Sequence, residues 1–152
     1  MNVMDSAHLA DVVDRMAIID QLSRYCFAVD FGDWEALESI FADDVDATYL
    51  LGPHGLDDVH RDDRAGIIGW LRSVLGESSV QAPVHALTNH LITVEGNAGW
   101  SSSYLASGGG TYTAEWRRTS DGWRAIRWEM RNYGVPESVR RIREGRAGGA
   151  VH

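Results

Sequence analysis

The sequence predicts one α+β domain in which helices of the N-terminal half cover one face of a curved antiparallel sheet. Apolar residues recur at three- and four-residue steps up to about residue 75, and at two-residue steps after Pro83. The first spacing is typical of helices and the second of strands. Helices followed by consecutive strands favour an α+β arrangement over alternating units. The 152 residues fit a single domain (1–152), with neither a repeat nor a linker.

Three helices are expected in the first half of the chain. The first begins at a cap provided by Asp5 or Ser6, because short polar side chains accept hydrogen bonds from the free N–H groups of a helix start. It runs to about Val29. Asp33 caps a second, shorter helix over residues 34–41.

A first strand is predicted over residues 45–51, where alternate side chains are apolar. A loop with Gly, Pro and Asp signals follows over residues 52–60. Asp62 or Asp63 then caps the third helix, which carries apolar residues such as Ile67 and Leu71 at helical spacing.

The second half predicts an antiparallel sheet. Strands are expected over residues 84–95, 98–107, 111–119 and 123–133, with turns at 96–97 and 120–122. The glycines at 108–110 predict a bulge or a bend. Residues 136–152 are expected to form a short helical or frayed tail.

Composition excludes several classes of function. The net charge of −8 repels polyphosphate, so no nucleic acid partner is expected. No apolar run has membrane-spanning length, and the N-terminus lacks the features of a signal peptide, so we expect a cytoplasmic protein with no membrane partner. The single cysteine, Cys26, falls on a helical apolar pattern and is expected to be buried and structural.

One loop gathers acidic and imidazole side chains, but their spacing fits no dedicated metal motif, so we predict no metal site. These residues are His54, Asp57, Asp58, His60, Asp62 and Asp63.

Three stretches carry a family resemblance. They read LSRYCFAVDFGDWEALESIFADDV, HALTNHLITVEGNA and GGGTYTAEWRRTSDGWRAIRWEMR, in that order. The ordered set resembles the SnoaL-like and scytalone dehydratase-like proteins of the NTF2-like superfamily and covers roughly the first 135 residues. The resemblance implies an NTF2-like cone, in which three helices and the curved sheet enclose an apolar pocket. It does not select a reaction.

The resemblance also implies a catalytic pair, Asp30 and His85. In the dehydratase relatives an acid at the position of Asp30 pairs with a histidine at the position of His85. A neutral imidazole is a suitable base near pH 7, and a carboxylate on its other nitrogen fixes the tautomer. The alternative to a catalytic pair is a structural pair that anchors a helix end to the sheet.

Further residues are assigned to substrate binding. Tyr25 and Tyr49 have counterparts in the family and are candidate donors to a substrate oxygen. Strand alternation places Asn89 on the face of His85, where it could also donate, and His90 on the opposite face.

Three more residues complete the predicted site. Trp128 and Met130 share one face of the last strand and are expected to form an apolar wall, and Tyr104 is added as a substrate contact. The strand that carries Tyr104 has serines but no second imidazole, unlike some relatives, which leaves simple proton transfer or cyclisation open.

The sequence therefore predicts a lyase or isomerase of dehydratase, ketosteroid isomerase-like or polyketide cyclase-like type. It needs no metal or organic cofactor and acts on an apolar, cyclic hydroxy-ketone. One alternative is a non-catalytic protein that binds an apolar small molecule. Another is the small subunit of an aromatic-ring dioxygenase. From the family we expect a homodimer or homotrimer formed through the outer face of the sheet.

Overall fold

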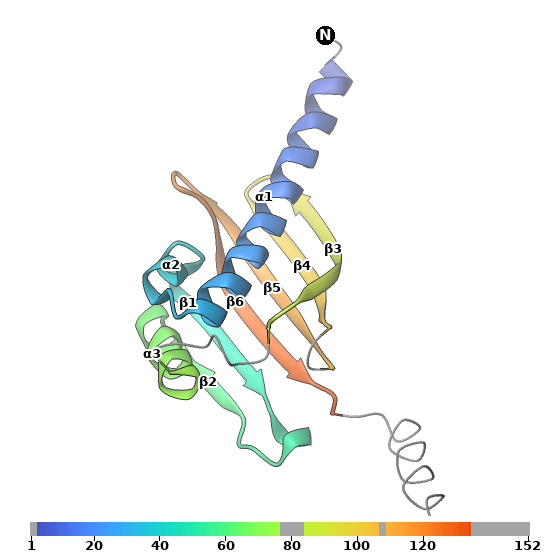
Figure 1. Cartoon of the computed structure of the whole chain (residues 1–152). Helices are drawn as coiled ribbons and strands as arrows, with labels where there is room; N and C mark the ends of the chain where they lie inside the picture. Colours follow the sequence, from blue (N-terminus) through green and yellow to red (C-terminus); the bar gives the residue numbers. More distant parts are fainter. Residues whose placement is uncertain (1–2, 77–83, 107–108, 135–152) are drawn as a thin grey trace, which may run out of the picture.

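The helices lie on one face of a curved, six-stranded sheet with strand order β2-β1-β6-β5-β4-β3 (Figure 1). A computed structural model describes residues 3–76, 84–106 and 109–134, so the predicted tail at 136–152 lies outside the described residues. The elements are α1 (Val3–Phe31), α2 (Trp34–Glu38), β1 (Phe41–Leu50), the 3-10 turn η1 (Gly52–His54), β2 (Val59–Arg61), α3 (Arg64–Leu75), β3 (Leu87–Glu95), β4 (Ala98–Leu105), β5 (Gly110–Thr119) and β6 (Gly122–Asn132).

The α+β prediction is confirmed, and the sheet has one pairing that the sequence did not predict. β3, β4, β5 and β6 form the expected antiparallel series, whereas β1 runs parallel to β6, with Tyr49 opposite Met130. The sheet is therefore mixed rather than antiparallel throughout. A parallel pair needs a long crossover connection, and everything between β1 and β6 supplies it.

Several boundaries differ from the prediction. α1 begins at Val3, so Asp5 and Ser6 lie inside the helix instead of capping it. α2 ends at Glu38, because Ser39 closes the helix by bonding back to Ala36. Phe41, expected in that helix, is instead the first residue of β1 and is fully buried. The predicted loop also contains the short strand β2, which pairs with β1.

One face of α1 forms the main contact between helix and sheet. Its side chains at successive turns, Ile18, Leu22, Tyr25 and Val29, are almost completely buried. α1 packs against β3 and β6, while α3 packs against β1. No helix in the described ranges is both long and apolar enough to cross a membrane.

A β-bulge in β3 changes which side chains face the helices. The pairing with β4 shifts between Thr88 and Leu91, and Asn89 has a φ of 55°. The extra residue reverses the alternation. His90 and Ile92 therefore turn toward α1, and our assignment of His90 to the outer face was wrong.

A partly buried ion pair ties the N-terminal half of α1 to the hairpin of β5 and β6. The carboxylate of Asp14 accepts two hydrogen bonds from Arg118 and one, at 3.3 Å, from the indole N–H of Trp123. The hydrogen bonds from Arg118 lower the pKa of Asp14. The guanidinium of Arg118 also lies 4.6 Å from the centre of the Trp123 ring.

The Asp14→Asn variant should lose about 1–3 kcal/mol of unfolding free energy at pH 7, the usual cost of breaking hydrogen bonds to a charged group. Because the folded pKa of Asp14 is lowered, its contribution is present above about pH 3.9 and is lost as the pH falls through the folded pKa. Urea denaturation at pH 7 and pH 3 measures both effects. The control Asp11→Asn removes only an exposed ion pair with Arg15 and should cost less than about 0.5 kcal/mol.

Cys26 is buried, as predicted, and burial raises the pKa of its thiol to about 11. The thiolate is the reactive form. The folded protein should therefore react with iodoacetamide at pH 8 at least about 100-fold more slowly than the urea-unfolded chain, where the usual thiol pKa of about 8.5 applies. Equal labelling rates in the two states would contradict the buried placement.

Candidate active site

The end of α1 and the chain just before β3 meet through Asp30 and His85. One carboxylate oxygen of Asp30 lies 2.6 Å from Nδ1 of His85, and the other accepts the backbone N–H of His85 at 2.8 Å. Both side chains are largely buried, with 14% of Asp30 and 19% of His85 exposed. The carboxylate thus fixes the ring and the backbone of the same residue.

This contact determines which ring nitrogen of His85 can act as a base. An ionised carboxylate only accepts hydrogen bonds, so the proton of the neutral ring must be on Nδ1. Nε2 then carries the free lone pair, and no described side chain bonds to it. The arrangement can hold a neutral imidazole ready to take a proton and can stabilise the imidazolium that results.

Beside this pair lies a buried cluster of tyrosine hydroxyls. The hydroxyl oxygen of Tyr25 is 2.8 Å from that of Tyr49 and 3.3 Å from that of Tyr112. The indole N–H of Trp128 donates to the hydroxyl of Tyr49 at 3.2 Å. The ring of Tyr25 also contacts the ring of His85 edge to face, with 6.5 Å between ring centroids, so the cluster and the Asp30–His85 pair are neighbours.

The cluster holds more donors than it can satisfy. Three hydroxyls and one indole provide four protons, but only three contacts join these groups, and no other described side chain bonds to the hydroxyls. One hydroxyl proton therefore has no acceptor inside the cluster. Burial raises the pKa of Tyr25, Tyr49 and Tyr112, so all three remain protonated donors across the pH range in which proteins are folded.

The structure separates the other predicted contacts into two groups. Trp128 and Met130 are buried on the inner face. Trp128 also contacts the tyrosine cluster through the ring of Tyr112. Asn89 and Tyr104 line a cleft of about 520 Å³ on the outer face of the sheet. The expectation that Asn89 shares a face with His85 was wrong, since the bulge turns Asn89 outward. Alternation on β4 points Tyr104 away from the buried Ser103, so Tyr104 lies on the outer face as well.

The bulge also brings a second imidazole to the inner side, which the sequence analysis missed. Nδ1 of His90 lies 2.7 Å from the hydroxyl of Ser103, and burial lowers the pKa of His90. His90 is therefore biased toward its neutral form. Ser101 lies two residues before Ser103 on the same face of β4, and its hydroxyl accepts the indole N–H of Trp116. Both inward-facing serines of β4 therefore have partners.

Tyr112 was not predicted, although its strand carried a usable signal. On β5 the buried residues Tyr112, Ala114 and Trp116 alternate with exposed or half-buried ones, and a tyrosine on a buried face requires a hydrogen-bond partner.

Besides the surplus hydroxyl of the tyrosine cluster, one further donor is unsatisfied. It is the indole N–H of Trp34 on α2, which is buried and has no hydrogen-bond partner in the described part of the chain.

Three of the six residues grouped in the acidic loop have structural partners. Asp58 accepts the backbone N–H groups of Leu51 and Gly52. His60 pairs with Asp46 on β1, and Asp63 caps α3. Within residues 3–76, 84–106 and 109–134, no group of three or more His, Cys, Asp or Glu side chains is arranged to hold a metal ion.

Comparison with solved structures gives a consistent fold. A protein from Novosphingobium aromaticivorans, proposed to be an aromatic ring hydroxylase, is 29% identical over 82% of this chain and 92% of its own, with a TM-score of 0.65. An NTF2-like protein with a cystatin-like fold from the same organism is 23% identical over 93% of this chain and 96% of its own, with a TM-score of 0.68.

A third similar structure is an NTF2-like protein of unknown function from Pseudomonas putida, 15% identical over 84% of this chain and 91% of its own, with a TM-score of 0.65. No match was found among curated proteins. Residues 10–129 match the model of the SnoaL-like domain. Because that model covers most of its length, the chain belongs to the SnoaL-like family, and its fold is that of the NTF2-like proteins it resembles.

Proposed function

We propose that the chain is a cofactor-independent lyase or isomerase that moves a proton on an apolar, cyclic hydroxy-ketone. The observation that carries this proposal is the double contact of Asp30 with His85, which in the neutral ring leaves the lone pair of Nε2 free at the edge of an aromatic interior. A carbonyl compound placed there would meet a base on one side and a hydroxyl donor on the other.

The reaction needs only groups of this chain. Nε2 of His85 removes the proton next to the carbonyl, and the electron pair of the broken C–H bond moves onto the carbonyl oxygen. The surplus hydroxyl proton of the tyrosine cluster stabilises the enolate. Collapse of the enolate then expels a β-hydroxyl, which takes the proton from the imidazolium and leaves as water. In the isomerase version the proton returns to a different carbon.

The surroundings favour an apolar ligand. Tyr25, Tyr112 and Trp128 pack ring against ring, and each is at most 2% exposed. A ligand that reaches the hydroxyls of Tyr25 and Tyr112 would be surrounded by these rings. Desolvation on entry would strengthen the hydrogen bond from the surplus hydroxyl to the carbonyl oxygen.

Deuterium exchange at the carbon next to the carbonyl of 1-tetralone, a bicyclic apolar ketone, tests the step that lyase and isomerase share. In D2O the wild-type protein should catalyse exchange, measured by NMR. The variants His85→Gln and Asp30→Asn should each slow exchange by about 10²–10⁴-fold, the usual contribution of a positioned base. Tyr112→Phe should slow it less, because two hydroxyls remain.

The chain offers a matched control. His60 and Asp46 form a His–Asp pair at 2.9 Å on the surface, with 59% and 52% of their side chains exposed. His60→Gln should leave exchange unchanged. No catalysed deuterium exchange by the wild type, or an unchanged exchange rate in His85→Gln, would contradict the catalytic proposal. Tight 1-tetralone binding without exchange would then favour a binding protein, and loss of stability alone in Asp30→Asn would favour a structural pair.

One observation favours a second candidate function. The relative proposed to be an aromatic ring hydroxylase is 29% identical to this chain, and the small subunit of an aromatic-ring dioxygenase was an alternative from the sequence. Such a subunit should co-purify from its native host with a larger iron-bearing chain. A tagged protein that elutes alone, at the mass of this chain or a multiple of it, would count against this candidate.

A further inference from the structure

α1 is apolar on two opposite faces. Its inner face packs on the sheet, and its apolar side chains are spread around the helix rather than gathered on that face. At about 100° per residue, Leu9, Met16 and Phe27 lie opposite the core-facing Ile18. Six side chains of this outer side are more than half exposed: Leu9, Val12, Val13, Met16, Phe27 and Phe31.

These exposed side chains form two clusters with a polar segment between them. The N-terminal cluster is Leu9, Val12, Val13 and Met16. The C-terminal cluster is Phe27 and Phe31, whose rings stack with 6.1 Å between centroids and 9° between planes. Between the clusters, Asp20 and Arg24 form an exposed ion pair at 2.8 Å.

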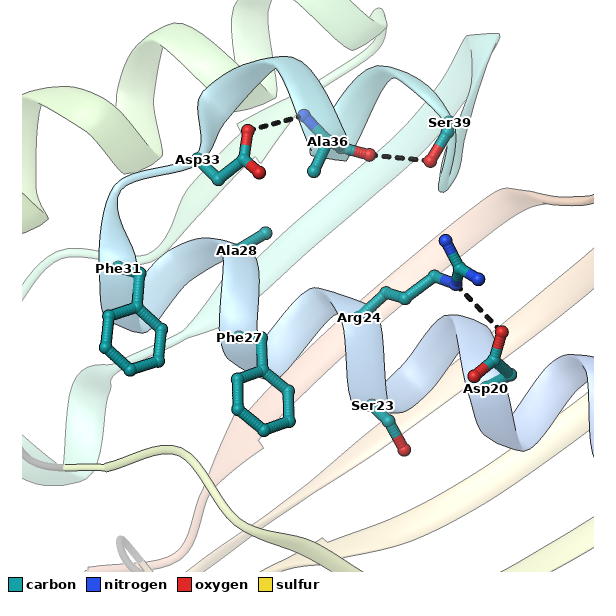
Figure 2. A pocket seen from close by; sticks show the side chains of 9 residues that line it. All are labelled: Asp20, Ser23, Arg24, Phe27, Ala28, Phe31, Asp33, Ala36 and Ser39. Atoms are coloured by element: carbon teal, nitrogen blue, oxygen red, sulfur yellow. Dashed lines mark hydrogen bonds and ion pairs between the residues drawn. The ribbon is translucent and has the colours of Figure 1, made fainter.

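The C-terminal cluster borders a groove between α1 and α2. Figure 2 shows Phe27 and Phe31 side by side on α1, and Asp33, Ala36 and Ser39, which also line the groove, on the segment of α2. The groove has a volume of about 450 Å³. Its lining combines the apolar Phe27, Ala28, Phe31 and Ala36 with the polar Asp20, Ser23, Arg24, Asp33 and Ser39.

The N-terminal cluster lies on a part of the helix that has little support from the domain. Figure 1 shows the first turns of α1 projecting beyond the sheet. From Ser6 onward, Asp14 is the first position of the helix that is mostly buried, with 9% exposed, so from Ser6 to Val13 the helix has almost no burial. Helical stability in proteins comes mainly from the packing of an apolar face, and here that face is unpacked.

We propose that two copies of the chain pair antiparallel through the outer sides of α1, with the two-fold axis near residue 22. Each N-terminal cluster then lies on the Phe27–Phe31 cluster of the other copy, with Val13 opposite Phe31. Leu9 reaches the α2 side of the groove.

Charge complementarity favours a second copy as the occupant. The same register places Asp20 of each copy opposite Arg24 of the other, so that two reciprocal ion pairs form across the axis. The charged residues between the two apolar clusters are therefore paired with their counterparts in the other copy by the two-fold symmetry. In a two-fold interface a patch must complement itself, and this helix does so in the order of its apolar and charged residues.

Mass measurement by light scattering after gel filtration tests the pairing. Met16→Glu buries a carboxylate in the proposed contact and should convert the dimer to a monomer at 10 µM, or halve the mass of a larger assembly. The matched control is Leu91→Glu on the outer face of the sheet, where Leu91 is 75% exposed and where the family leads us to expect an interface. That control should leave the α1 contact intact.

A cysteine scan tests the register. Ser23 is exposed next to the proposed axis, so Ser23→Cys should give a covalent dimer with a short bismaleimide linker, while native Cys26 is buried. Ser73→Cys, on the exposed side of α3, is the control and should give none. A monomeric wild type, a mass that Met16→Glu leaves unchanged, or equal crosslinking of the two cysteine variants would overturn the proposal.

Discussion

The contact between one carboxylate and one histidine joins the two halves of this fold. Asp30 lies in the last turn of α1, and His85 lies just before β3, 55 residues later in the chain. Because both oxygens of Asp30 bind His85, the helix end, the start of the strand and the orientation of the ring are fixed together. A buried carboxylate without this partner would be costly, so the contact has structural value whatever its chemical role.

The electrostatics of the interior follow from burial. Desolvation raises the pKa of each clustered tyrosine and thus keeps each hydroxyl a proton donor. The Trp128 indole can only donate, so its hydrogen bond occupies one acceptor site of the Tyr49 hydroxyl. Inside the cluster, the hydroxyl protons can therefore bond only to other hydroxyl oxygens. The His85 base, which Asp30 holds, is thus next to the tyrosine cluster with its surplus donor, because the rings of His85 and Tyr25 are in contact.

Much of this arrangement could be predicted from the sequence, and the exceptions have physical causes. The helical apolar pattern that carries Cys26 and the cap expected at Asp62 or Asp63 are local signals: Cys26 is buried on α1, and Asp63 caps α3. The parallel pairing of β1 with β6 depends on contacts distant in sequence, which local alternation does not specify. The assumed extension of the second helix to Phe41 failed because Ser39 closes it early.

The bulge at Asn89 explains the errors in the site. Alternation is reliable only while a strand remains regular, and one extra residue exchanged the faces of Asn89 and His90. Asn is among the few residues that adopt a positive φ readily, but it does so too seldom for a single Asn in a strand pattern to predict a bulge. The pairing of Asp30 with His85 was expected from the family resemblance, and the structure has the two in contact. Both lie outside this irregular segment.

The proposed role of His85 as a base depends most on the tautomer of its ring. Long-range ¹H–¹⁵N correlation spectra of the uniformly labelled protein, with His85 assigned through His85→Gln, report which ring nitrogen carries the proton. A neutral His85 ring with its proton on Nδ1 and a free lone pair on Nε2 is the predicted result. A proton on Nε2, or a ring that averages between the two tautomers as a solvent-exposed histidine does, would show that Asp30 does not hold this imidazole as a base.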